Sequence, residues 1–156
     1  MEAGFHHGMG WPKPEGYFAE RLAEARSGRI VVLVAVGEDS RYLGHTLVRW
    51  ASRYPAFREH DIPEVQDLNV VAQSRRQGVG SMLLDDAERL IAERSPSAGI
   101  GVGLYAAYGP AQRLYVRRGY VPDGAGVDYD NEPVAPGSAV RVDDALLLHL
   151  IKPLRV

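Results

Sequence analysis

The segment of the chain with the clearest chemical potential is residues 68–84, LNVVAQSRRQGVGSMLL. It places Arg75 and Arg76 shortly before two glycines, Gly78 and Gly80, and an amphipathic run follows at once. Glycines let neighbouring backbone N–H groups point into one space, and the N-terminus of a helix adds a partial positive charge there. The two arginines can add full positive charges. The pattern therefore predicts an anion-binding loop, for which a pyrophosphate is the natural ligand.

The spacing separates this loop from two common phosphate-binding loops. Leu83 stands where the dinucleotide fingerprint requires its third glycine, which disfavours NAD. No Gly-Lys-Ser/Thr occurs, so the loop that binds nucleoside triphosphates is absent. The R-x-x-G-x-G spacing over residues 75–80 instead resembles the Q/R-x-x-G-x-G/A signature of the GNAT superfamily of acyltransferases. Leu68 and Val70 take the place of the family's L-x-V, just upstream of the arginine.

A second block of the sequence supports the same resemblance. Residues 108–120, YGPAQRLYVRRGY, are similar to the family's N-x-x-A-x-x-L-Y-x-x-x-G-F/Y segment. The matching positions are Ala111, Leu114, Tyr115, Gly119 and Tyr120. Tyr108 departs from the pattern, because the family often has an asparagine at this place. Two blocks in the family's order are more specific than either glycine pattern alone, and the resemblance spans residues 16–151.

The resemblance implies that acetyl-coenzyme A is the cosubstrate and that no metal is needed. In GNAT enzymes the pantetheine arm pairs with the backbone of the signature strand like an added strand, and the glycine-rich loop holds the pyrophosphate. Carried onto this chain, the implied cofactor-binding residues are Leu68, Val70, Val71, Arg75, Arg76, Gln77, Gly78, Val79, Gly80, Ser81, Tyr108 and Ala111.

Acetyl transfer to an amine requires a neutral amine, a stabilised oxyanion and a proton for the departing thiolate. The resemblance assigns the oxyanion to a backbone N–H near Val70 and the proton donor to Tyr115. On spacing alone, Tyr115 also fits a core aromatic residue on one helix face with Ala111 and Leu114.

The residue that takes the proton from the amine is expected on the signature strand. Glu64 lies on the same alternating face as Leu68 and Val70, and it can act directly or through a water molecule. Asp67 is the second choice, because it lies on the opposite face if the strand is regular. A solvated carboxylate at Glu64 and an enzyme without a dedicated base are the alternatives.

The residues that meet the acceptor are less determined. His45 fits a packed histidine on a strand, or one that lines the acceptor site. The run 128–132, DYDNE, fits a solvated loop or an attractor for a cationic amine. In the family, the wall of the acceptor site is often formed at the place taken here by Trp11, Tyr17 and Phe18. These residues also fit a second interpretation, in which they pack over a shortened N-terminus.

Hydrophobic periodicity and turn residues predict the elements that position these side chains. Helices are expected over 15–26, 80–94 and 110–117, and strands over 29–36, 42–51, 64–71, 100–106 and 144–151. Loops are expected over 52–63 and 122–141, and residues 1–15 as an irregular segment. This order predicts a mixed α/β sheet flanked by helices. The resemblance makes it the GNAT acyl-CoA N-acyltransferase fold, with the family's first strand and helix truncated.

Length and composition set the remaining expectations. A chain of 156 residues, 46% of them hydrophobic, fits a single domain over 1–156. The net charge of -2 does not suggest a partner nucleic acid, and no apolar run approaches the length that spans a membrane. The absence of cysteine excludes disulfides and thiolate nucleophiles. With no secretory signal pattern at its start, the chain is expected to be cytoplasmic.

These observations together predict an acetyl-CoA-dependent N-acetyltransferase acting on a primary amine of a small molecule, such as an aminoglycoside-like compound, a polyamine or an amino acid. Acetylation of a protein N-terminus or lysine is the alternative within the same chemistry. A catalytically idle acyl-CoA-binding module is the alternative in a different class. The resemblance also implies a homodimer, since members of the family are often dimers.

Overall fold

The computed structural model describes residues 13–155, which fold as two compact units. The first unit contains the chain up to Trp50 together with Val65–Ile91, and the second contains Ala51–Glu64 and the chain from Ala92 onward. Both units combine helices with strands, so the architecture is the mixed α/β class that the sequence predicts. None of the helices in the described part of the chain is long and apolar enough to cross a membrane.

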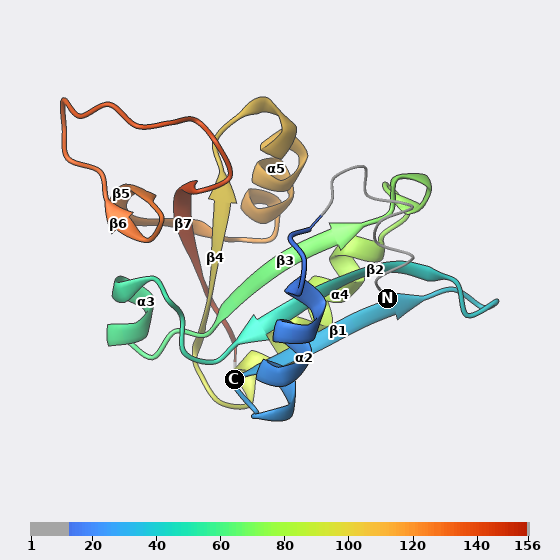
Figure 1. Ribbon diagram of the computed structural model, residues 1–156. Coiled ribbons are helices and arrows are strands. Elements are labelled where there is room, and N and C mark those ends of the chain that lie inside the picture. The colour runs from blue at the N-terminus through green and yellow to red at the C-terminus, as the bar shows by residue number, and fades with distance from the viewer. Residues whose placement is uncertain (1–12, 156) are drawn as a thin grey trace. The chain divides into compact units, whose positions relative to one another are not determined.

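The first unit is built on three strands in the order β1-β2-β3. Its elements are α2 (Tyr17–Arg26), β1 (Ile30–Val36), β2 (Tyr42–Arg49), β3 (Glu64–Val70), the 3-10 helix η1 (Ala72–Ser74) and α4 (Val79–Ala92). β1 and β2 form the antiparallel hairpin that the sequence predicts, with Ile30 opposite Arg49 and Val34 opposite His45. Figure 1 shows α2 in front of these two strands and α4 behind them.

Successive side chains along β1 point to opposite faces of the sheet, so they pack toward two different helices. Leu33 and Ala35 pack with Val79 and Leu83 of α4 in one apolar cluster. Val32, one residue away from Leu33, lines a pocket beneath α2 instead. This period of two is the geometry of a pleated strand that is covered on both faces.

The second unit contains four strands in the order β4-β7-β5-β6, and each neighbouring pair is antiparallel. Its elements are α3 (Pro55–Glu59), β4 (Ser97–Gly103), the 3-10 helix η2 (Ala106–Tyr108), α5 (Gly109–Arg117), β5 (Val121–Tyr129), β6 (Glu132–Pro133) and β7 (Leu146–Pro153). The ring of Phe57 lies so close to β4 that a Cβ at Gly99 would stand 2.3 Å from it. Glycine at this position therefore lets α3 pack directly on the strand.

The structure corrects two predicted loops. The segment 52–63 contains α3, whose first turn is started by Pro55, a residue that fits the beginning of a helix. The segment 122–141 contains β5 and β6, joined by a turn in which Asp130 and Asn131 have φ values of 50° and 65°. Of the predicted irregular segment 1–15, only residues 13–15 belong to the described part, and Trp11 lies outside it.

The other predicted elements are confirmed, with boundaries shifted by a few residues. The largest shift concerns the strand predicted over 100–106, which runs from Ser97 to Gly103 and is followed by η2. A register shift between Pro122 and Val127 marks where the glycines of β5 interrupt its pairing with β7.

Candidate active site

The loop between β3 and α4 contains left-handed backbone turns of the kind that can form an anion-binding site. Arg76 and Gly78 take left-handed conformations, with φ values of 60° and 84°, and α4 begins at Val79. Alternation of left-handed and right-handed residues turns successive N–H groups toward one side of the chain. Nothing lies within 4 Å of the place where a Gly78 Cβ would stand, so the space over the loop is open. The predicted pyrophosphate loop thus lies at the N-terminus of the predicted helix.

Two side chains tie this loop back to earlier residues, one to the end of β3 and one to η1. Arg75 donates a hydrogen bond from Nε to the carbonyl oxygen of Val70, at 3.0 Å. Gln77 donates from Nε2 to the carbonyl oxygen of Gln73, at 3.1 Å. Arg75 is exposed, so its bond to β3 orients the guanidinium at the mouth of the loop without burying its charge.

The strand β3 is irregular in its middle. Asp67 has a φ of 53°, and the side chain of Asn69 donates a hydrogen bond to the Asp67 carbonyl oxygen at 2.9 Å. A left-handed residue breaks the alternation of faces along a strand. The sequence argument that placed Asp67 on the opposite face assumed a regular strand, and this assumption is wrong.

The Asp67 carboxylate lies beside two side chains from the start of the described chain. The hydroxyl of Tyr17 donates a hydrogen bond to it, and the Nζ atom of Lys13 lies 3.8 Å from its Oδ1. Burial raises the pKa of Asp67, and the charge of Lys13 acts in the opposite direction. Its side chain nevertheless keeps 28% of its surface exposed, so the carboxylate remains in reach of a ligand.

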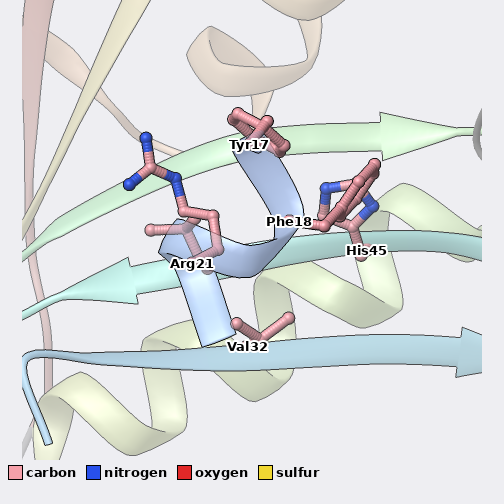
Figure 2. A pocket seen from close by; sticks show the side chains of 6 residues that line it. Tyr17, Phe18, Arg21, Val32 and His45 are labelled. Atoms are coloured by element: carbon pink, nitrogen blue, oxygen red, sulfur yellow. The ribbon is translucent and has the colours of Figure 1, made fainter. Parts of the chain in front are cut away.

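A narrow pocket lies under α2, next to Tyr17. It is lined by Tyr17, Phe18, Arg21, Val32, His45 and Leu47. Figure 2 shows Tyr17, Phe18 and Arg21 on α2, with His45 and Val32 on the strands beside it. Its volume of about 10 Å³ is roughly the space of one water molecule. His45 is buried, and its Nδ1 shares a hydrogen bond with the Tyr42 hydroxyl. Burial lowers the pKa of His45 to about 4, with a smaller contribution from Lys13, so the ring is neutral at physiological pH.

A buried ion pair joins α2 to β2 in the first unit. Arg49 donates from Nη1 and Nη2 to the two carboxylate oxygens of Glu24, at 2.9 and 3.0 Å, and from Nε to Gln66 Oε1 at 3.0 Å. The hydrogen bond from Arg49 lowers the pKa of Glu24 to about 2, although burial acts against it. The helix that carries Tyr17 and Phe18 is therefore fixed to the strand by a two-pronged charged contact.

In the second unit, Glu64 belongs to a buried cluster rather than to a solvated strand end. It is 4% exposed and accepts a hydrogen bond from the Ser52 hydroxyl. His149 of β7 lies with Nε2 3.6 Å from Glu64 Oε1, which is an ion-pair distance but too long for a hydrogen bond. Nδ1 of the same ring lies 2.6 Å from Asp128 Oδ1. Asp128 is thus part of β5 and buried, and the interpretation of 128–132 as a solvated loop is wrong at this residue.

His149 is the member of this cluster that sequence reasoning missed. Its ring stacks on Tyr54 with centroids 3.7 Å apart, and Phe57 meets it edge-on. Burial alone would lower the pKa of His149, but Asp128 and Glu64 outweigh it and raise the pKa to about 9. The available signal was one histidine inside the apolar run of the closing strand, DALLLHLI.

The predicted residues of the second sequence block lie on and before α5. Tyr115 is 5% exposed and packs at 6.0 Å from the ring of Tyr120. Burial raises the pKa of Tyr115, so its hydroxyl keeps its proton at neutral pH. Tyr108 covers Gly103, where a Cβ would stand 2.3 Å from the tyrosine ring, and its hydroxyl donates to Asp144 at 2.8 Å.

The predicted site residues fall into two groups by unit. The backbone of β3 from Val65 onward and the whole glycine-rich loop, with the first turn of α4, belong to the first unit. Glu64, Tyr108, Ala111 and Tyr115 belong to the second. Within the first unit, Asp67, Tyr17 and Lys13 come together, which the sequence did not indicate.

Comparison with known proteins places this arrangement in a family. The sequence model of the acetyltransferase (GNAT) family matches residues 4–120. A search of curated proteins gives no match. Among solved structures, that of nourseothricin acetyltransferase is similar with a TM-score of 0.61 and 24% identity, covering 83% of this chain and 68% of its own.

Two further solved structures share the fold. The ribosomal-protein-alanine N-acetyltransferase from Brucella melitensis has a TM-score of 0.62 and 20% identity, covering 90% of this chain and 78% of its own. Naa20 from Chaetomium thermophilum, in complex with a bisubstrate analogue, has a TM-score of 0.64 and 17% identity, covering 92% and 75%. With most of its length matched by the family model, the chain belongs to the GNAT family of acetyltransferases and is an N-acetyltransferase.

Proposed function

We propose that the protein transfers the acetyl group of acetyl-CoA to the primary amine of a small molecule. The observation that carries the proposal is the open loop at Arg76 and Gly78, which ends at the N-terminus of α4. Oriented N–H groups, a helix N-terminus and neighbouring arginines form the donor set that a pyrophosphate requires. The residues present therefore fit the cosubstrate that this family uses.

Each chemical task of the transfer has a proposed residue. The backbone N–H at Val70 stabilises the oxyanion, and the backbone of Leu68 and Val71 holds the pantetheine arm. Tyr115 protonates the departing thiolate, and its burial supports this role, because a raised pKa keeps the hydroxyl protonated until the thiolate forms. Glu64 takes up the proton from the amine, and its ion-pair contact with His149 supports a carboxylate that is held in one orientation.

The acceptor class is the part of the proposal with a specific rival. A structural neighbour named for a small molecule, nourseothricin, favours a small-molecule amine. A neighbour named as a ribosomal-protein-alanine N-acetyltransferase favours a protein acceptor. Release of free thiol from acetyl-CoA should be measured with spermidine, free lysine, an aminoglycoside and an N-terminal peptide. Turnover confined to the peptide would reject the small-molecule proposal in favour of its rival.

Binding of the cosubstrate is tested by thermal unfolding with and without acetyl-CoA. A ligand that binds the native state raises Tm, and we expect this rise in the natural chain and its loss in Gly78→Glu. Gly28→Glu is the matched control, because Gly28 also has a positive φ and no neighbour within 4 Å of its Cβ position. No rise in the natural chain, or an equal loss in both variants, would contradict the proposed loop.

The role of Tyr115 is tested by Tyr115→Phe, which removes the hydroxyl and keeps the ring. We expect kcat to fall by about a hundredfold, within the usual range for a lost acid–base group, while the Tm rise with acetyl-CoA persists. A variant that turns over at the natural rate would remove Tyr115 from the mechanism.

A further inference from the structure

Lysine is scarce in this chain, and one of its lysines has a specialised environment. Lys13 and Lys152 are the only lysines among the 18 basic Lys and Arg residues. Lys152 lies over the ring of Tyr120, with Nζ 5.7 Å from the ring centroid. Lys13 lies over the ring of Tyr17 at 4.8 Å and also faces the Asp67 carboxylate.

The groups around Lys13 are those that recognise a primary ammonium ion. A carboxylate oxygen lies 3.8 Å from Nζ, and the face of an aromatic ring lies beside it. The Tyr17 hydroxyl donates to the other carboxylate oxygen, which fixes the carboxylate relative to the ring. Both charged side chains are about a quarter exposed, at 22% for Lys13 and 28% for Asp67, so another amine can reach the same place.

The position of Asp67 connects this contact with the transfer reaction. Asp67 lies on β3, the strand whose later residues, Leu68 to Val71, are proposed above to hold the pantetheine arm and the oxyanion. The adjacent pocket under α2 has room for about one water molecule and cannot hold an acceptor. The ammonium group of an acceptor therefore has its best partners at Asp67 and Tyr17.

We propose that Asp67 and Tyr17 bind the ammonium group of the acceptor amine, and that Lys13 occupies this site in the unliganded chain and is acetylated there by the enzyme itself. The inference rests on the proposed function, because it needs acetyl-CoA bound along β3. It adds the residues that recognise the ammonium group and a modification site on the chain.

The self-acetylation step is balanced by acetyl-CoA alone. The Lys13 ammonium group loses a proton to the base of the transfer reaction, while Asp67 holds the nitrogen in place. The neutral amine attacks the thioester carbonyl carbon, a C–N bond forms and the C–S bond breaks. The coenzyme leaves as a thiol after gaining one proton, and one further proton is released to solvent. Each event consumes one acetyl-CoA and leaves one neutral acetyl-lysine.

The test is to incubate the full chain with acetyl-CoA and no added amine, and to quantify acetylation of both lysines by peptide mass spectrometry. Lys152 serves as the internal control for non-enzymatic acetylation. We expect Lys13 to be acetylated at least roughly tenfold faster than Lys152, because its amine is held at the reacting site. Equal rates at the two lysines would overturn the proposal.

Two variants separate the site from a general effect on folding. Asp67→Asn should lower the Lys13 rate to that of Lys152, and Tyr17→Phe should lower it less, since the ring is kept. Methylammonium chloride should slow acetylation of Lys13 but not of Lys152, whereas the same concentration of sodium chloride should not discriminate. A Lys13 rate that is unchanged in Asp67→Asn would overturn the assigned site.

Failure of the proposed function and failure of the Lys13 site give different experimental results. If the proposed function fails, the natural chain shows no Tm rise with acetyl-CoA. If only the present inference fails, the Tm rise and turnover of added amines persist while Lys13 gains no preference over Lys152.

Discussion

Two buried clusters of charged side chains, one in each unit, differ in how completely their polar atoms are satisfied. In the first unit, Arg49 uses three nitrogen atoms to reach Glu24 and Gln66, each at a normal hydrogen-bond distance. In the second unit, His149 lies between Asp128 and Glu64 but makes a hydrogen bond only to Asp128. Within residues 13–155, Asp128 Oδ2 and His149 Nε2 are the buried side-chain atoms without a hydrogen-bond partner.

The difference shows how the choice of cation determines what a buried cluster can do. A guanidinium stays charged at any physiological pH, and its planar group of N–H donors matches the two oxygens of a carboxylate. The first cluster is therefore a structural contact that does not change with pH, called the fixed joint below. An imidazolium can lose its proton, and its cluster then holds two carboxylates without a cation. The second cluster is therefore the one whose stability depends on pH.

The largest expected effect comes from breaking the fixed joint. Arg49→Met removes the two-pronged partner of the buried Glu24 carboxylate while Arg21 remains beside it, and we expect a loss of up to about 3 kcal/mol in the free energy of unfolding. Urea unfolding measures this loss. Glu24→Leu combined with Arg49→Met should recover most of it, because the buried carboxylate is removed together with the guanidinium. Arg89→Met is the control, since the Arg89–Asp86 pair lies on the surface of α4. A loss no greater than in this control would show that the joint is not structural.

A smaller loss in the free energy of unfolding is expected from a substitution in the second cluster, around His149. Asp128→Asn keeps the shape of the side chain but removes the charge from the hydrogen bond to His149, which should cost about 1.5–3 kcal/mol below pH 6.5. Asp130→Asn, at an exposed position in the following turn, should be nearly neutral. Equal effects of the two changes would mean that His149 is not held by the charge of Asp128.

The smallest expected effect is the pH dependence of the free energy of unfolding, which only the second cluster should produce. The pKa of His149 is raised in the folded state from 6.5 to about 9, so its contribution to stability is complete below pH 6.5 and is lost as the pH rises through about 9. The free energy of unfolding of the natural chain should fall over this interval. In His149→Gln the same titration should be nearly flat there, whereas Arg49→Met should keep the slope. A natural chain without the slope would show that His149 is neutral when folded.

The elements that sequence reasoning predicted well are those with strong local patterns. The β-branched run of β1 and the apolar stripe of α4 each contain enough residues to show their period. The helix α3 has five residues and is too short for a periodic signal. The strand β5 contains prolines and glycines that are typical of loops, and its pairing with β7 overrides this local preference.

The same distinction applies to the candidate site. The glycine-rich loop is local, so its spacing was sufficient to predict both its conformation and the helix that follows. The contacts of His149 with Asp128 and of Tyr17 with Asp67 join residues 21 and 50 positions apart, and no spacing rule encodes them. The left-handed residue at Asp67 also could not be read from a run of strand-forming residues, because its neighbours fit a regular strand.

The scarcity of lysine has a practical consequence for measuring this protein. Lys13 belongs to the first unit and Lys152 to the second, so each unit carries one side-chain amine. Bifunctional amine reagents of stepped length can therefore join the two units through these lysines without any engineered cysteine, and peptide mapping distinguishes this link from one through the α-amino group. The shortest reagent that links them, with and without coenzyme A, which has no acetyl group to transfer to Lys13, would report any movement of one unit against the other.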